Sequence, residues 1–140
     1  MIHNITKKTV IAKNPVAALT MYERGRGMIA RDFRDFDAMV FNNCSCIHTM
    51  FMSISIDVIF VDKGNQICGL RKNLVPWIPF ARAPGASAVV ELPVGAIERA
   101  LCEKGDFLDL NAELTEKAKE ALLSKEFATA AHPAMPFKQN

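Results

Sequence analysis

The side chains best suited to chemistry lie in residues 44–62, the most apolar part of the chain. They are Cys44, Cys46, His48 and Asp57. A thiol, an imidazole and a carboxylate are the groups from which a nucleophile, a base and an orienting acid are built. A hydrolase-like enzyme would therefore use Cys44, His48 and Asp57.

The spacing of His48 and Asp57 allows that chemistry only if the strand between them is bent. Alternation over residues 48–56 predicts a strand covered on one side, and the apolar run 56–61 predicts a central strand covered on both sides. The two residues are an odd number of positions apart, so on one straight strand they face opposite ways. A site that joins them predicts a bulge or bend around residues 53–55.

Asp57 has a structural interpretation as well. A carboxylate inside an apolar run needs partners, because burying it unpaired is costly. It would then accept hydrogen bonds from backbone N–H groups of a loop, or pair with an arginine. Glu91, in the apolar run 88–92, is a second acid of this kind and a possible partner for an arginine.

The spacing of Cys44, Cys46 and His48 does not favour a metal site. Side chains two residues apart on a strand are about 6.6–6.8 Å apart. Two sulfurs on one zinc ion are only about 3.8 Å apart, since each Zn–S bond is about 2.3 Å. We therefore predict small buried thiols, with no metal and no cofactor.

The rest of the chain has the pattern of short strands. Ordered loops that contain proline and aromatic residues are often functional, and the segment 74–87 contains Trp77 and Phe80, either exposed or covering one end of the core. The other predicted elements are strands at 9–12, 38–41, 66–70, 88–92 and 107–110, a hairpin loop at 62–65 and a short helix within 94–102. This order predicts a mainly β (β-rich α+β) fold, a compact β-barrel or sandwich-like domain with short helices.

Length and composition place the chain among globular proteins. It has 140 residues, of which 50% are hydrophobic, and a formal net charge of +2. These values suit one domain with a real core and give no electrostatic case for nucleic acid or acidic membranes. We predict no membrane span, since no apolar run reaches the roughly 20 residues required. The N-terminus does not resemble a signal peptide, which predicts a cytoplasmic protein with reduced cysteines.

A block of mixed charge occupies residues 22–36. Its basic members are Arg24, Arg26, Arg31 and Arg34, and acidic side chains interrupt them. Such a mixture is typical of a solvated face of a protein rather than of an RNA-binding surface.

The C-terminal part differs from the rest. Leu114, Ala118, Ala121 and Leu122 have the spacing of an amphipathic helix. We predict three parts: a β-rich domain at 1–110, an appended helix at 111–127 and a flexible tail at 128–140. The narrow apolar stripe of the helix suits peripheral packing or a homodimer through residues 111–127.

Several motifs occur in an order that resembles a known family. They are Arg26-Gly27-Met28-Ile29-Ala30-Arg31, the strand Met39-Val40-Phe41, Ile47-His48-Thr49 with Ile56-Asp57-Val58, Pro76-Trp77, Glu91-Leu92-Pro93 and Gly105-Asp106. Together they resemble the bacterial and archaeal domain-of-unknown-function 192 family over roughly residues 16–110. The resemblance implies a compact β-barrel or sandwich-like domain, and no established activity.

Three functions are consistent with these residues. The first is a non-catalytic β-barrel module that binds a small polar ligand or a peptide, with the ligand-binding residues Cys44, His48, Asp57, Arg31 and Trp77. The second is an interaction or assembly protein that docks a partner through the 74–87 loop or the C-terminal helix. The third is the hydrolase-like enzyme described above.

Overall fold

The computed structural model describes residues 1–110, apart from the side chains of residues 21–23, and it is rich in strands. The strands are β1 (Ile2–Asn4), β2 (Thr9–Ala12), β3 (Pro15–Ala17), β4 (Ala38–Asn42), β5 (Cys46–Ile47), β6 (Ile56–Val61), β7 (Ile67–Leu74), β8 (Ala81–Arg82), β9 (Ala88–Pro93) and β10 (Leu108–Asp109). The helices are α1 (Met21–Arg26) and α2 (Ala96–Arg99). The prediction of a mainly β fold is confirmed.

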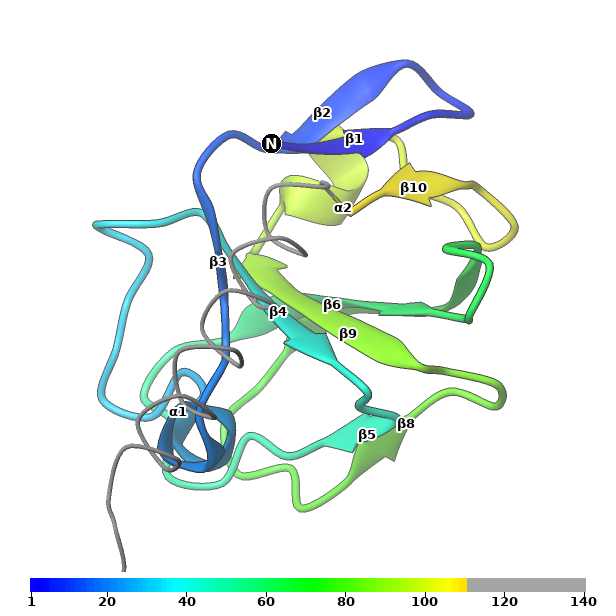
Figure 1. The fold of residues 1–140 in the computed structure, drawn as a ribbon. Helices are drawn as coiled ribbons and strands as arrows, with labels where there is room; N and C mark the ends of the chain where they lie inside the picture. The colour runs from blue at the N-terminus through cyan, green and yellow to red at the C-terminus, as the bar shows by residue number, and fades with distance from the viewer. Residues whose placement is uncertain (111–140) are drawn as a thin grey trace, which may run out of the picture.

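The strands of residues 1–110 form three separate sheets, so their pairing does not close into one barrel. Five strands form the central sheet in the order β3-β4-β9-β6-β7. Strands β10-β1-β2 form a second sheet, and β5-β8 form a third. Figure 1 shows α2 between the β1-β2-β10 sheet and the central sheet, with α1 and the β5-β8 pair at the other end of the molecule.

Successive side chains of the central strands point to opposite faces of the sheet, and this divides the core into two clusters. Ile59 and Val61 of β6 pack in the cluster that contains α2, whereas Val58 and Phe60 pack in the cluster on the opposite face. All six residues of β6 are buried, and β6 lies between β9 and β7. The prediction of a central strand covered on both sides is therefore confirmed.

The predicted strand at 48–56 is wrong. Strand β5 ends at Ile47, and the chain forms turns and loop until β6 begins at Ile56. Phe51 has a φ of +64°, a left-handed conformation that an extended strand does not allow. Alternation alone misled the prediction here, because hydrogen bonds to a distant loop determine the path of this segment.

Those hydrogen bonds centre on the buried side chain and backbone of Thr49. Its N–H donates to Ile78 O at 2.8 Å, and its carbonyl accepts from Trp77 N at 2.8 Å. Its hydroxyl donates to Val75 O at 2.7 Å and accepts from Ile78 N at 2.9 Å. The 48–55 loop and the loop that contains Trp77 are thus held together through one residue.

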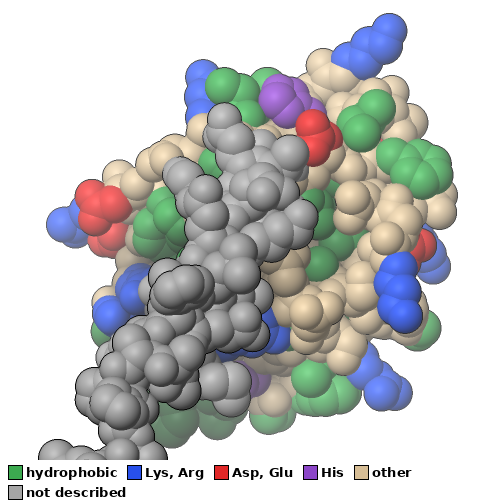
Figure 2. Space-filling model, viewed as in Figure 1, with side chains coloured by type: hydrophobic (Ala, Val, Ile, Leu, Met, Phe, Trp, Pro, Cys, Tyr) green, Lys and Arg blue, Asp and Glu red, His purple; other side chains and the backbone are tan. Residues whose placement is uncertain are grey.

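The remaining predictions fall partly outside the described residues. The helix at 111–127, the tail at 128–140 and the homodimer through 111–127 lie there and stay predictions. Within residues 1–110, no helix has the length and apolar character that a membrane crossing requires. On the coloured part of Figure 2, basic and acidic side chains are interspersed.

Candidate functional site

Asp57 lies on the face of the central sheet that packs against α2. Its Oδ1 accepts a hydrogen bond from Asn73 N at 2.9 Å. Its Oδ2 accepts from Gly95 N at 3.0 Å and from Ile97 N at 3.1 Å. Asp57 therefore joins β6, β7 and the first turn of α2, which is the structural role that its position in an apolar run suggested.

Glu91 lies on the other face of the same sheet and has no such partners. Its side chain is buried, with 3% of the residue exposed, and no hydrogen bond within the described residues reaches its Oε2. The opposed residues on either side are Met39 of β4 and Val58 of β6, both apolar. Burial raises the pKa of Glu91 to about 8, so the carboxyl group keeps its proton at neutral pH.

The Glu91 carboxyl group borders a cavity of about 130 Å³, which we call the Glu91 cavity. Its walls come from α1 and the turn after it, from β4 and β5, from the loop after β5, and from β9. The lining residues include Arg24, Arg26, Gly27, Met28, Phe41, Cys44, Cys46, His48, Met52 and Glu91.

Gly27 allows the chain to turn over this cavity. Helix α1 ends at Arg26, and Gly27 has a φ of +49°, a left-handed conformation that side chains disfavour. A Cβ atom at this position would lie 3.5 Å from Phe41 Cζ and 3.8 Å from Glu91 Oε2. The turn after α1 therefore lies directly over the Glu91 carboxyl group and the Phe41 ring.

Backbone carbonyl groups orient the two arginines of the cavity. Arg24 donates from Nη1 to Asn42 O at 2.5 Å and from Nη2 to Asn43 O at 3.2 Å. Arg26 donates from Nε to Ile29 O at 3.1 Å. Among the side chains that the structure describes, which do not include those of residues 21–23, neither guanidinium group has a carboxylate within 4.0 Å. The mixed charge of residues 22–36 predicts a solvated face, but the fold places both arginines in the wall of this cavity.

Cys44 and His48 also line the Glu91 cavity, but they are not bonded to each other. The Cys44 thiol donates to Cys46 O at 3.2 Å, and His48 Nδ1 accepts from Met50 N at 3.2 Å. Burial raises the pKa of the Cys44 thiol, an effect that the hydrogen bond to the Cys46 backbone and the charge of Arg24 partly offset. Among the described residues, no three side chains of the metal-ligating types lie close enough to hold a metal ion.

The hydrolase arrangement needs a carboxylate beside His48. No continuous strand joins His48 to β6, and this interruption is what that arrangement required. Asp57, however, directs its carboxylate to the N–H groups around α2, on the opposite face of the sheet from the Glu91 cavity. The described geometry therefore brings Cys44 and His48 to one cavity and leaves Asp57 outside it.

Arg31 and Trp77 lie elsewhere. Arg31 lines a separate cavity with Asp32, Asp35 and other residues of the 30–36 segment. Trp77 is 57% exposed and packs against Phe51, with 4.9 Å between the ring centroids. Neither residue borders the Glu91 cavity.

The sequence of this chain is similar to those of known proteins. A family model described as "Uncharacterized ACR", DUF192, matches residues 3–110. The chain belongs to the DUF192 family. A UPF0127 protein of Thermococcus sibiricus is 35% identical to this DUF192 protein over 120 residues, which cover 81% of this chain and 76% of the relative. A UPF0127 protein of Pyrococcus furiosus is 37% identical over 65 residues, 46% of this chain and 55% of the relative.

Solved structures resemble this DUF192 protein in fold. A protein of unknown function from Novosphingobium aromaticivorans matches it with a TM-score of 0.60 and 24% identity, over 68% of this chain and 73% of that chain. At that identity the likeness concerns the fold alone.

Proposed function

We propose that this protein is a non-catalytic binding module that holds a small polar ligand in the Glu91 cavity. The observation that carries the proposal is the Glu91 carboxyl group, which is buried beside a cavity and has an oxygen without a hydrogen-bond partner among residues 1–110. A buried polar group without a partner costs roughly 1–3 kcal/mol. A ligand that hydrogen-bonds to Glu91 would remove that cost.

The composition of the walls supports the same proposal. Phe41, Met28 and Met52 supply apolar surface, and the polar groups are few. Small-molecule sites usually combine apolar walls with a small number of placed polar groups. A dry cavity of about 150 Å³ in another protein takes benzene, so a cavity of this size suits a ligand of about six non-hydrogen atoms. A peptide would place only one terminus or side chain in it.

The test is a screen of small polar compounds against the full chain, followed by amide chemical shifts in two-dimensional NMR spectra. A ligand of the Glu91 cavity is expected to shift the amide signals of Gly27 and Met28. The indole N–H signal of Trp77, outside the cavity, serves as the internal control. A Glu91→Leu variant is expected to lose the response. A screen in which no compound shifts Gly27 or Met28 at millimolar concentration would contradict the proposal.

A second candidate, a protein-interaction surface, is favoured by the exposed rings of Phe51 and Trp77. These residues are 66% and 57% exposed, and hydrogen bonds to Thr49 hold the two loops in place. Exposed aromatic residues are enriched at interfaces. If a partner docks here, Trp77→Ala weakens its binding by about 2 kcal/mol or more, as at interaction hot spots. An unchanged affinity in a direct binding measurement would remove this candidate.

A further inference from the structure

The charges around the Glu91 cavity are unbalanced. Among its described lining residues, Arg24 and Arg26 are permanently charged, and Glu91 is the single carboxyl group. Because burial keeps Glu91 protonated at neutral pH, this acid does not neutralise the arginines. The described residues that line the cavity therefore supply two cationic groups and no anion.

Hydrogen-bond donors also remain available there. Arg26 uses its Nε for Ile29 O, and no described residue accepts a hydrogen bond from its two terminal amino groups. A protonated carboxyl group has an O–H donor, and that of Glu91 has no acceptor among residues 1–110. Both groups line the same cavity and have donors available to a ligand there.

We infer that the Glu91 cavity takes a small oxyanion, a carboxylate or a phosphate, whose oxygens accept hydrogen bonds from the Glu91 carboxyl group and from the Arg26 and Arg24 guanidinium groups. This inference rests on the proposed function, because it names the ligand class of the same cavity. Guanidinium groups match the geometry of carboxylates and phosphates, and hydrogen bonds to charged groups are about twice as strong as neutral ones.

Other ligand classes match the cavity less well. A cationic ligand would approach two guanidinium groups, and it would pair with Glu91 only after that group lost its proton. A neutral ligand would bind Glu91 but leave both arginines without a counter-charge from any described side chain. An anion satisfies all three side chains in the protonation states that they already have.

The inference predicts how affinity changes with pH. Glu91 donates only while it is protonated, so affinity is highest below about pH 8 and falls as the carboxyl group ionises. Among the described residues, the charged and titratable groups that line the cavity with it are Arg24, Arg26, Cys44, Cys46 and His48. The neighbouring strands place the apolar Met39 and Val58 opposite Glu91. A His48→Gln variant separates any histidine titration from that of Glu91.

The experiment uses four probes of similar size on the full chain: acetate, inorganic phosphate, acetamide and methylammonium. Acetate, phosphate or both are expected to shift the Gly27 and Met28 amide signals. The affinity from that titration should be at least about tenfold higher than the affinity for acetamide or methylammonium. The tighter of acetate and phosphate identifies the oxyanion. Acetate is also titrated between about pH 6 and pH 9.5, a range in which it stays ionised.

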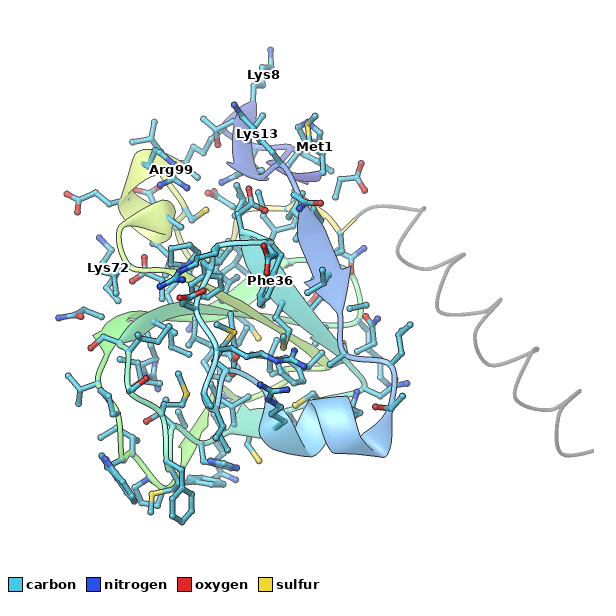
Figure 3. All side chains as sticks on the ribbon, turned by 90° about the vertical axis from the view of Figure 1, so that its left-hand side faces the viewer. Met1, Lys8, Lys13, Phe36, Lys72 and Arg99 are labelled. Carbon is cyan, nitrogen blue, oxygen red and sulfur yellow. The ribbon has the colours of Figure 1, made fainter. Side chains whose placement is uncertain are left out.

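Variants assign the binding to the named side chains. Arg26→Gln is expected to weaken acetate or phosphate binding at least about tenfold. The matched control is Arg99→Gln, since Arg99 is exposed on α2, which Figure 3 shows apart from α1. Glu91→Gln keeps a donor, so affinity at pH 7 stays within about threefold while the fall above pH 8 disappears. Amide signal dispersion checks that each variant is folded.

The possible results separate this inference from the proposed function. If acetamide or methylammonium binds as tightly as the anions, the oxyanion inference is overturned and the binding function stands. The same holds if other polar compounds bind while all four probes fail. Anion binding that responds equally to Arg26→Gln and Arg99→Gln is general charge attraction and also overturns the inference. If no small polar compound reaches the cavity, both proposals fail.

Discussion

Asp57 and Glu91 lie on neighbouring antiparallel strands and point to opposite faces of the central sheet. In the β6-β9 pairing Asp57 is opposite Leu92, and Glu91 is opposite Val58, one register step away. Asp57 accepts three backbone hydrogen bonds, whereas the Oε2 of Glu91 accepts none within residues 1–110. Two acids in similar apolar runs thus have different environments, and different consequences follow from replacing each.

Replacing Glu91 by methionine is expected to stabilise the protein. Methionine has a similar size and needs no hydrogen-bond partner, so the free energy of unfolding should rise by about 1–3 kcal/mol at about pH 4, where Glu91 is largely protonated in both states, and by more at pH 7. Chemical denaturation measures the change, with Glu98→Met on the exposed surface of α2 as the control. A clear loss of stability would show that the Glu91 carboxyl group makes contacts that stabilise the fold.

The stability of the wild-type protein is expected to fall between about pH 4.5 and pH 8. The pKa of Glu91 rises from 4.5 to about 8 on folding, so the folded state binds more protons than the unfolded state in that range. Stability from this group is therefore fully present below pH 4.5 and is lost as pH rises to about 8, at about 1.4 kcal/mol per pH unit.

The comparison that isolates this effect is wild type against Glu91→Gln, measured by denaturation at several pH values. The difference in unfolding free energy between them should change by a few kcal/mol over the range and be constant above about pH 8.5. Parallel curves for the two proteins would mean that the carboxyl group is already ionised in the folded state.

Replacing Asp57 by alanine is expected to destabilise the fold strongly. Three backbone N–H groups lose their acceptor, those of Asn73, Gly95 and Ile97, and the free energy of unfolding should fall by roughly 3 kcal/mol or more. Asp32→Ala is the control, because Asp32 is exposed and its ion pair with Arg34 contributes little. If Asp57→Ala is as stable as Asp32→Ala, the link between β6 and α2 has no energetic importance.

Replacing Thr49 by valine is expected to loosen the Trp77 loop. Valine keeps the shape but lacks the hydroxyl that bonds Val75 O and Ile78 N, at a cost of about 1–3 kcal/mol. Trp77 fluorescence should change, because the ring would no longer be held against Phe51. Thr49→Ser retains the hydroxyl and should preserve the fluorescence; a change of equal size in both variants would count against this role.

Local patterns were sufficient to predict the strands in which successive residues share one kind of environment. The apolar run of β6, the hairpin loop after it and the strand at 88–92 were predicted, since a buried strand needs apolar side chains on both faces. The acceptor role of Asp57 was one of two interpretations of a carboxylate in such a run. The family was also recognisable from the order of short motifs, and the match over residues 3–110 confirms it.

Only the tertiary structure decided which side chains share a cavity. The 48–55 segment became a loop because Thr49 bonds to residues 75–78, and no local alternation reports a contact so distant in sequence. Arg26 and Glu91 are far apart in the chain and line the same cavity because the turn after α1 lies over the Glu91 side chain of β9. The sequence by itself determined β6, the strand at 88–92, the family and the need for Asp57 to find partners. The absence of a described partner for the Glu91 Oε2 depends on the side chains that the folded chain brings around it, which no sequence pattern specifies.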